Sequence, residues 1–206
     1  MATTPERAAA GAVILAAGAG TRRGGPKALL EFEGRLLVER AVETALAGGC
    51  AQALVVLGAA AEQVCASAAL GAARVVVNPG WAEGMGSSLR AGLAALEPGG
   101  EVDAALVLLV DQPYIGPGAV RAVLDAWRAG ARLAAASYGG RRGHPALFGR
   151  EHWAAVARAS VGDRGARGYL AEHADELVLV SCDRLAVPQD LDVPADLASV
   201  RANDPN

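Results

Sequence analysis

Three cations and four glycines follow the first apolar segment of the chain, within VILAAGAGTRRGGPKALL at residues 13–30. Glycines permit positive φ and let backbone N–H groups approach phosphate oxygens closely. The Arg22 guanidinium can hold two oxygens through its fork, while Lys27 supplies a compact charge. Both would stabilise the charge that develops as pyrophosphate leaves a phosphoryl group. The segment therefore predicts a phosphate site with Arg22 and Lys27 as catalytic residues.

A carboxylate stands directly after the most hydrophobic segment, as Asp111 in LVLLVDQPYI. Mg²⁺ prefers one or two carboxylates together with phosphate oxygens, so Asp111 is the predicted magnesium ligand. An aspartate that only closes a turn is the alternative, because Asp is common after strands.

A third polar segment, NPGWAEGMGSSLRAGL at residues 78–93, leads from an apolar run into a helix-like one. Ser87 or Ser88 is predicted to cap that helix, which leaves its first N–H groups for an anion or a base edge. An ordinary capped helix is the alternative.

These three segments need a scaffold that brings them together. Short apolar runs predict strands that begin at Ala12, Ala53, Arg74, Ala104, Arg132 and Glu176. The second to fourth lack alternation, as strands covered on both faces do. Helix-like segments lie between the runs, at 36–46, 60–69, 87–96, 117–127 and 150–159.

This alternation predicts an α/β fold with three layers, a doubly wound and mostly parallel sheet of Rossmann-like type. Ligands of such sheets bind at the carboxyl ends of the strands, where all three polar segments would meet. We expect one domain over residues 1–206, with 1–11 outside the ordered part. The irregular region 138–175 is expected to be an insertion on the substrate side.

The glycine segment fits neither common nucleotide motif. Lys27 is not followed by Ser or Thr, as a Walker loop requires. The spacing of Gly18, Gly20 and Gly24 is one residue too long for a dinucleotide fingerprint, and the second strand ends without an acid for a ribose. The segment instead resembles the L-A-A-G-x-x-[ST]-R-M-G-x-x-K signature of nucleotidyltransferases, with Arg23 in place of Met.

Further segments resemble the molybdenum cofactor cytidylyltransferase branch of the molybdopterin-guanine-dinucleotide-synthase-like family. They include N-P-x-W-x-x-G-M-x-x-S-L from Asn78, G-H-P at 143–145, G-D-x-G-A-R at 162–167, and a late D-x-D-x-P in which Val193 replaces Thr. The resemblance runs from Ala12 to Ala202, with its motifs in family order.

The resemblance implies roles for individual residues. The implied nucleotide contacts are Leu15, Ala16, Ala17, Gly18, Gly20, Asn78, Gly84, Ser88 and Asp111. The implied acceptor contacts are Gly143, His144, Pro145, Asp163 and Arg167. It also supports Mg²⁺ at Asp111 and implies a second metal contact at Asp192, beside Asp190.

The implied reaction is the transfer of CMP from CTP to the phosphate of molybdopterin, which gives the cytosine dinucleotide cofactor and pyrophosphate. A molybdenum hydroxylase would be the recipient of that cofactor. Ala17 resembles the cytidylyl branch, because the guanylyl branch has glycine there. Two alternatives within the transferase class stay open, namely another phosphorylated acceptor and GTP as the donor. Two alternatives from other classes also stay open: an NAD(P)H-dependent oxidoreductase and a carrier that binds the cofactor without catalysis.

The composition of the chain excludes some classes of binding partner. A net charge of −3 without long basic runs argues against a nucleic-acid surface. The longest bulky apolar run is too short to span a bilayer, so no membrane is expected. Three cysteines without paired spacing predict reduced thiols in a cytoplasmic protein.

Overall fold

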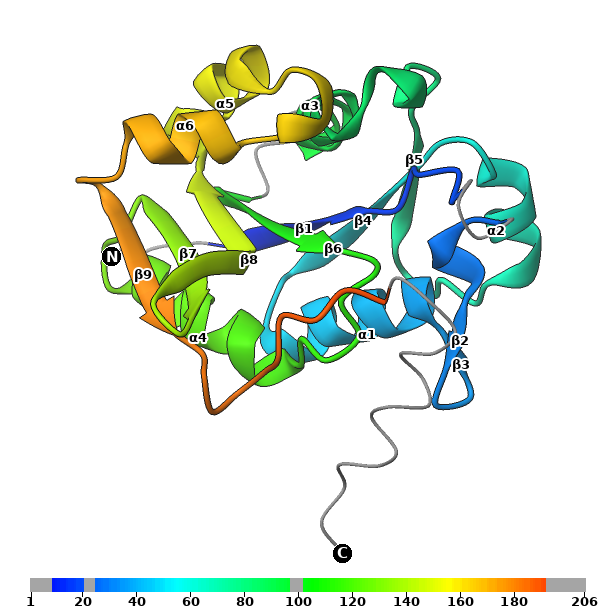
Figure 1. The fold of residues 1–206 in the computed structure, drawn as a ribbon, viewed down its shortest axis with the longest axis horizontal. Helices are drawn as coiled ribbons and strands as arrows, with labels where there is room; N and C mark the ends of the chain where they lie inside the picture. The colour runs from blue at the N-terminus through cyan, green and yellow to red at the C-terminus, as the bar shows by residue number, and fades with distance from the viewer. Residues whose placement is uncertain (1–8, 21–24, 97–101, 192–206) are drawn as a thin grey trace, which may run out of the picture.

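The computed structural model describes residues 9–20, 25–96 and 102–191. Its centre is a seven-stranded sheet in the order β5-β4-β1-β6-β8-β7-β9 (Figure 1). The parallel strands are β1 (Ala10–Leu15), β4 (Gln52–Leu57), β5 (Arg74–Val77), β6 (Ala104–Leu109), β7 (Leu133–Tyr138) and β9 (Leu177–Ser181), and only β8 (Arg141–Gly149) runs against them. The predicted doubly wound, mostly parallel sheet is thereby confirmed.

Helices cover both faces of this sheet (Figure 1). One face packs against α1 (Leu37–Gly48) and α4 (Pro117–Arg128), and the other packs against α3 (Met85–Leu96), α5 (Trp153–Ala159) and α6 (Arg167–Glu172). The short α2 (Ala61–Ser67) lies near the β5 edge. Each face buries its own hydrophobic cluster, which gives the three layers.

Local sequence explains the main helices. Pro117 opens α4, where a missing N–H costs nothing, and the buried side chains of α4 recur at helical spacing: Ala119, Val120, Val123, Leu124 and Trp127. Gly92 lets α3 approach β1, because a Cβ there would lie 2.3 Å from Cγ1 of Val13. The loop after β1 is thus set close to the start of α3.

Two predictions about the sheet are wrong. β5 is an edge strand with exposed Val75 and Val77, whereas its apolar run predicted burial on both faces. The region 138–175 is not an irregular insertion, since it supplies β8 at the centre of the sheet together with α5 and α6. Pro145 is tolerated in β8 because it falls at the irregularity opposite Ala135–Ser137, outside the β6 pairing.

Smaller differences concern the ends of the chain and minor elements. β1 begins at Ala10, so residues 10 and 11 belong to the sheet rather than lying outside the ordered part. Within the described ranges, the pair β2 (Glu31–Phe32) and β3 (Arg35–Leu36) and four short 3-10 turns carry no pattern that predicted them. The turns span Lys27–Leu29, Trp81–Glu83, Arg150–His152 and Gly162–Arg164. Among the described residues, no helix is long and apolar enough to cross a membrane.

Candidate active site

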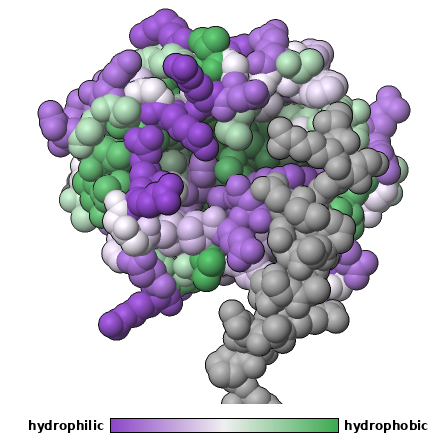
Figure 2. Space-filling model, in the orientation of Figure 1, coloured by the Kyte–Doolittle hydropathy of each residue, from purple (hydrophilic) through white to green (hydrophobic). Residues whose placement is uncertain are grey.

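Two adjoining cavities open where the parallel strands end. The first, of about 470 Å³, is here called the glycine-loop cavity because Gly18 and Gly20 line it together with Lys27 and Asp111. The second, of about 500 Å³, is called the arginine cavity because Arg141, Arg142, Arg164 and Arg167 line it. Residues that line both cavities are Leu15, Met85, Leu109, Arg167 and Asp190. The hollow lies on the face shown in Figure 2, where hydrophilic and hydrophobic residues meet around it.

Most of the predicted site residues line one of these two cavities. The glycine-loop cavity is lined by Leu15, Ala16, Ala17, Gly18, Gly20, Lys27, Gly84, Ser88 and Asp111. The arginine cavity is lined by Gly143, His144 and Arg167. Arg22 and Asp192 lie outside the described residues.

Gly20 and Gly25 lie close together after β1. Gly20 has φ +61°, and a Cβ on it would lie 1.7 Å from the carbonyl oxygen of Gly25. The N–H of Gly25 donates back to the Gly20 carbonyl at 3.3 Å. Only glycine fits position 20, whereas a Cβ on Gly18 would meet nothing within 4 Å. The exposed Gly18 backbone thus stays accessible to a ligand in the cavity.

Lys27 and Asp111 form an ion pair in this cavity. Lys27 Nζ lies 2.7 Å from Asp111 Oδ2, and the side chains are 26% and 20% exposed. A partly desolvated pair interacts more strongly than a surface pair. The ammonium is therefore placed beside the carboxylate, where an entering phosphate can contact it.

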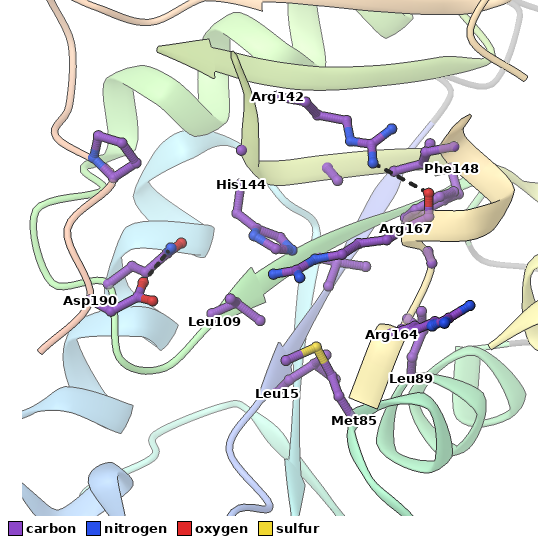
Figure 3. A pocket seen from close by; sticks show the side chains of 18 of the residues that line it. Leu15, Met85, Leu89, Leu109, Arg142, His144, Phe148, Arg164, Arg167 and Asp190 are labelled. Atoms are coloured by element: carbon purple, nitrogen blue, oxygen red, sulfur yellow. Dashed lines mark hydrogen bonds between the residues drawn. The ribbon is translucent and has the colours of Figure 1, made fainter. Parts of the chain in front are cut away.

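The late segment after β9 docks onto the same point. The Leu191 N–H donates to the Asp111 carbonyl at 2.8 Å. Gln112 Nε2 donates to Asp190 Oδ1 at 2.7 Å, an interaction drawn in Figure 3. Asp190 is thereby brought to both cavities from 78 residues away. The sequence drew attention to Asp192 instead, with Asp190 only as its neighbour.

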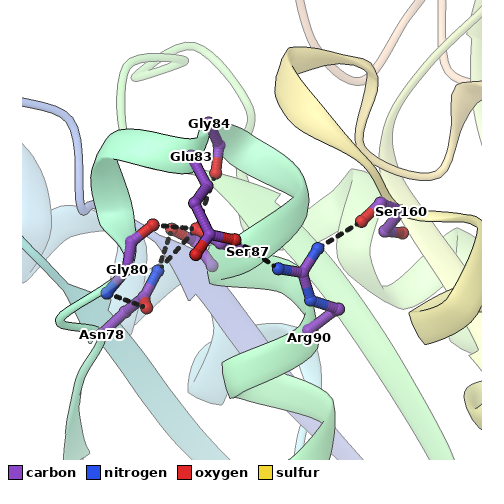
Figure 4. A network of polar contacts seen from close by, with 8 residues as sticks. Asn78, Gly80, Glu83, Gly84, Ser87, Arg90 and Ser160 are labelled. Carbon is purple, nitrogen blue, oxygen red and sulfur yellow. Dashed lines mark hydrogen bonds and ion pairs between the residues drawn. The ribbon is translucent and has the colours of Figure 1, made fainter.

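Asn78 organises the segment before α3 and does not line either cavity. It is buried, and its Nδ2 donates to Ser87 Oγ at 2.8 Å and to Ser88 Oγ at 3.1 Å (Figure 4). Its Oδ1 accepts from the Gly80 N–H at 3.0 Å. These contacts give Asn78 a positioning role in the loop, and its predicted nucleotide contact stays a prediction.

The predicted serine cap of α3 is wrong, because the helix begins two residues earlier, at Met85. Gly84 has φ +104°, and its carbonyl accepts from both the N–H and the hydroxyl of Ser87. Ser87 and Ser88 therefore lie in the first turn, facing Asn78. Ser88 still lines the glycine-loop cavity.

The start of α3 packs tightly on the turn at 160–163. A Cβ on Gly84 would lie 2.5 Å from Asp163 Oδ1, and one on Gly86 would lie 2.6 Å from the Ser160 carbonyl. Arg90 ties the two segments by donating to Ser160 O at 2.6 Å (Figure 4). Asp163, predicted on the acceptor side, consequently lines the glycine-loop cavity and not the arginine cavity.

The arginine cavity combines positive charge with a neutral histidine. His144 points into it beside Arg167 (Figure 3). The pKa of His144 is lowered to about 4, mainly by burial and also by Arg167 and Arg142, while Asp111 acts in the opposite direction. At neutral pH this imidazole is uncharged, so it can donate or accept a hydrogen bond without adding charge.

Tyr138 fixes the loop that carries His144. Its hydroxyl donates to the His144 carbonyl at 2.8 Å, and burial raises the pKa of Tyr138 well above its usual value. Gly143 lies against the Tyr138 ring, since a Cβ there would be 2.9 Å from two ring carbons. Pro145 is buried behind this loop and does not line the cavity.

The arginine cavity also has an apolar wall. The side chains that give it this character are Leu89, Val107, Ala146, Phe148 and Leu170. An apolar wall beside four guanidinium groups suits a flat ring system that carries anionic groups. The sequence named the G-H-P and G-A-R segments, but this apolar wall comes from strands and helices that carry no motif.

The carboxylates near the ion pair fit a magnesium ion that would also be coordinated by a substrate phosphate. Among residues 9–20, 25–96 and 102–191, no group of three or more His, Cys, Asp or Glu side chains forms a site. Asp111, with Asp190 close to it through the Gln112 and Leu191 contacts, offers carboxylate oxygens. Mg²⁺ takes one or two carboxylates and completes its shell with phosphate and water, so these residues fit it.

Comparisons with known proteins agree with this geometry. Residues 12–190 match the MobA-like NTP transferase domain family. Nicotine blue oxidoreductase of Paenarthrobacter nicotinovorans is 44% identical over 188 residues, which are 87% of this chain and 90% of that protein. Phosphoenolpyruvate guanylyltransferase of Sanguibacter keddieii is 33% identical over 64% of this chain and 46% of its own length.

A similar solved structure is that of Rv0371c from Mycobacterium tuberculosis H37Rv. It is 29% identical with a TM-score of 0.82, over 96% of this chain and all of that one. Another structure of Rv0371c, in complex with manganese, has a TM-score of 0.78. The family match over residues 12–190 covers most of the sequence. The seven strands of the main sheet form one continuous sheet within the same fold. This chain therefore belongs to the family of MobA-like NTP transferase domains, and it is a nucleotidyltransferase.

Proposed function

We propose that this protein transfers CMP from CTP to the phosphate of molybdopterin, or of the molybdenum cofactor, and releases pyrophosphate. The observation that carries the proposal is the Lys27–Asp111 ion pair in the glycine-loop cavity, which adjoins a second cavity rich in arginine. A transferase needs two anionic substrates side by side with charge stabilisation between them. Two adjoining cavities with this pair near their boundary meet that need.

The nucleotide would occupy the glycine-loop cavity. Backbone groups at Gly18 and Gly20 would approach its phosphates, and Ala17 and Ser88 line the space left for ribose and base. Lys27 would neutralise the pyrophosphate as it leaves, since charge grows on that group in the transition state. The sequence adds Arg22 to this role.

A magnesium ion would be held by Asp111 with Asp190, and Asp192 is the further ligand that the resemblance implies. Bound there, the ion supplies charge neutralisation and alignment of phosphate oxygens. The manganese complex of Rv0371c supports a divalent metal in a protein of this fold.

The acceptor would occupy the arginine cavity, with its ring against the apolar wall and its phosphate toward Arg167. A phosphate monoester is already anionic near neutral pH, so its oxygen attacks the α-phosphorus in line without a general base. This agrees with a neutral His144 that positions a substrate by hydrogen bonding.

The compartment we propose is the cytoplasm. Cys50, Cys65 and Cys182 are free thiols, as the reducing cytoplasm favours. The cofactor product would pass to a molybdenum hydroxylase.

A second candidate function is NAD(P)H-dependent reduction of a dye, and the similarity to nicotine blue oxidoreductase favours it. Against it stands the end of β4, where Leu57 leads into Gly58 and no acid is present to hold a ribose. A Cβ on Gly58 would lie 2.5 Å from the Ala17 carbonyl, which indicates close packing at the position where a dinucleotide fold places that acid.

One experiment separates these functions and tests the carrier as well. Pyrophosphate release is measured with Mg²⁺ and each of CTP, GTP, UTP and ATP, with and without molybdopterin. Oxidation of NADH and NADPH is followed in parallel with nicotine blue as acceptor. Release only with CTP and molybdopterin, abolished by EDTA, is the expected result. Release with GTP or with another acceptor would correct the substrates, NAD(P)H oxidation would favour the reductase, and no turnover with intact cofactor would favour a carrier.

A further inference from the structure

Arg167 stands at the boundary of the two cavities. It lines both of them, together with three apolar residues and Asp190. Arg141, Arg142 and Arg164 line only the arginine cavity, and Lys27 lines only the glycine-loop cavity. Within the part of the chain that the structure describes, Arg167 is therefore the cation common to both.

The backbone around Arg167 is fixed by its neighbours. Gly165 has φ +52°, and a Cβ on it would lie 3.3 Å from the Met85 sulfur at the start of α3. The carbonyl of Arg167 accepts from Arg142 Nη2 at 3.3 Å. In Figure 3 the guanidinium of Arg167 extends into the cavity toward His144, whereas that of Arg164 is directed away from it.

The charges near this guanidinium come from both cavities. Besides burial, Arg167 and Arg142, which line the arginine cavity, lower the pKa of His144, and Asp111, which lines the glycine-loop cavity, raises it. Arg167 also lowers the pKa of Arg142, after burial as the main cause. Arg167 and Asp111 both line the glycine-loop cavity, and both act on the His144 imidazole.

Phosphoryl transfer creates a problem at this boundary. Two anionic phosphates must approach to bonding distance, and their repulsion opposes the approach. A guanidinium carries several N–H donors in a planar fork, so it can contact an oxygen on each phosphate at once. A lysine ammonium is a compact charge and lacks that fork.

We propose that Arg167 is a catalytic residue that contacts the nucleotide α-phosphate and the acceptor phosphate together. This inference rests on the proposed function. An acceptor phosphate oxygen forms a bond to the α-phosphorus while the bond from that phosphorus to the bridging oxygen breaks. Pyrophosphate leaves with the electron pair, and Arg167 stays protonated throughout.

The test uses binding probes, so that it does not depend on knowing the acceptor. Calorimetric titration measures the affinity of a CTP analogue with a methylene group between its α- and β-phosphorus atoms, and separately that of inorganic phosphate. Arg167→Gln is expected to weaken both probes by about tenfold or more, as the loss of a charged hydrogen bond does. The matched control Arg141→Gln removes the same charge from a residue that lines the arginine cavity alone, so it is expected to weaken only phosphate.

Arg167→Lys provides a second variant, which keeps the charge and loses the fork. It is expected to retain most of the affinity for each probe and to lose kcat, because the two contacts can no longer be made together. Thermal melts of each variant show that the fold is intact. Weakening of phosphate alone by Arg167→Gln, as for Arg141→Gln, would overturn the assignment. Absence of transfer by the unmodified protein would overturn the proposed function, while the two titrations would still decide whether Arg167 reaches both sites.

Discussion

Lys27 and Asp111 are 84 residues apart in the chain, and their side chains meet at 2.7 Å where the loops after β1 and β6 come together. Neighbouring parallel strands end at the same edge of the sheet, and β1 and β6 are paired from Ala10 to Leu15. The pair is therefore a product of topology. It joins the cation that we propose binds phosphate to the carboxylate that we propose binds the metal.

Removing either partner should impair transfer more than binding. Lys27→Ala and Asp111→Asn are each expected to lower kcat for pyrophosphate release by about 10²- to 10³-fold, in the range for loss of one preorganised charge. Steady-state kinetics over a range of CTP and Mg²⁺ concentrations measure the effect. Arg121→Ala, on the exposed face of α4, is the control and should leave kcat unchanged. Wild-type kcat in both site variants would exclude the pair from the reaction.

Choice of the base should depend on Ala17. Ala17→Gly is expected to relax the preference for CTP over GTP, because the methyl group lines the glycine-loop cavity where the larger purine would need space. The ratio of kcat/KM for the two nucleotides measures it. Ala16→Gly removes the same methyl group from the adjacent lining residue, and we expect it to change both nucleotides equally. An unchanged ratio in Ala17→Gly would refute the role.

The turn at Gly20 should not tolerate a side chain. Gly20→Ala is expected to destabilise the protein by about 1–3 kcal/mol and to weaken nucleotide binding, because φ is +61° and the new Cβ would overlap the Gly25 carbonyl. Denaturant unfolding and nucleotide titration provide the two readouts. Gly25→Ala is the matched control, since a Cβ there meets nothing within 4 Å. Equal stability of the two variants would mean that the turn is not held as described.

Stability should fall as the pH is lowered through the range of His144. Its pKa in the folded protein is about 4, below the ordinary value of 6.5, so the unfolded chain binds more protons between these values. The contribution of the neutral imidazole is present above about pH 6.5 and is lost progressively toward pH 4. Urea unfolding of the wild type and of His144→Gln at pH 7, 6, 5 and 4 tests this. The variant should show a shallower dependence over that interval, and parallel curves would contradict the assignment.

The sequence alone predicted the parallel sheet, because β4 and β6 are nearly continuous apolar runs that can be covered on both faces. It also predicted the phosphate loop, since glycines and two cations directly after a strand have a local chemical meaning. Lys27, Asp111 and the residues from Leu15 to Gly20 were found in this way. Local patterns of this kind depend on residues that are close in sequence, so they can be interpreted without knowing where the segment lies in the fold.

Tertiary structure decided the rest. β8 could not be predicted, because Gly143 and Pro145 disfavour a strand and only pairing with β6 and β7 stabilises one there. Asp163 could not be assigned to its cavity, since the close approach of Gly84 determines its place. Asp190 reaches both cavities through its contact with Gln112, which lies far away in sequence. Arg167 reaches them because Gly165, two residues before it, packs close to Met85. Residue type and spacing specify the chemistry of each segment, whereas the packing of strands and helices decides which segments share a site.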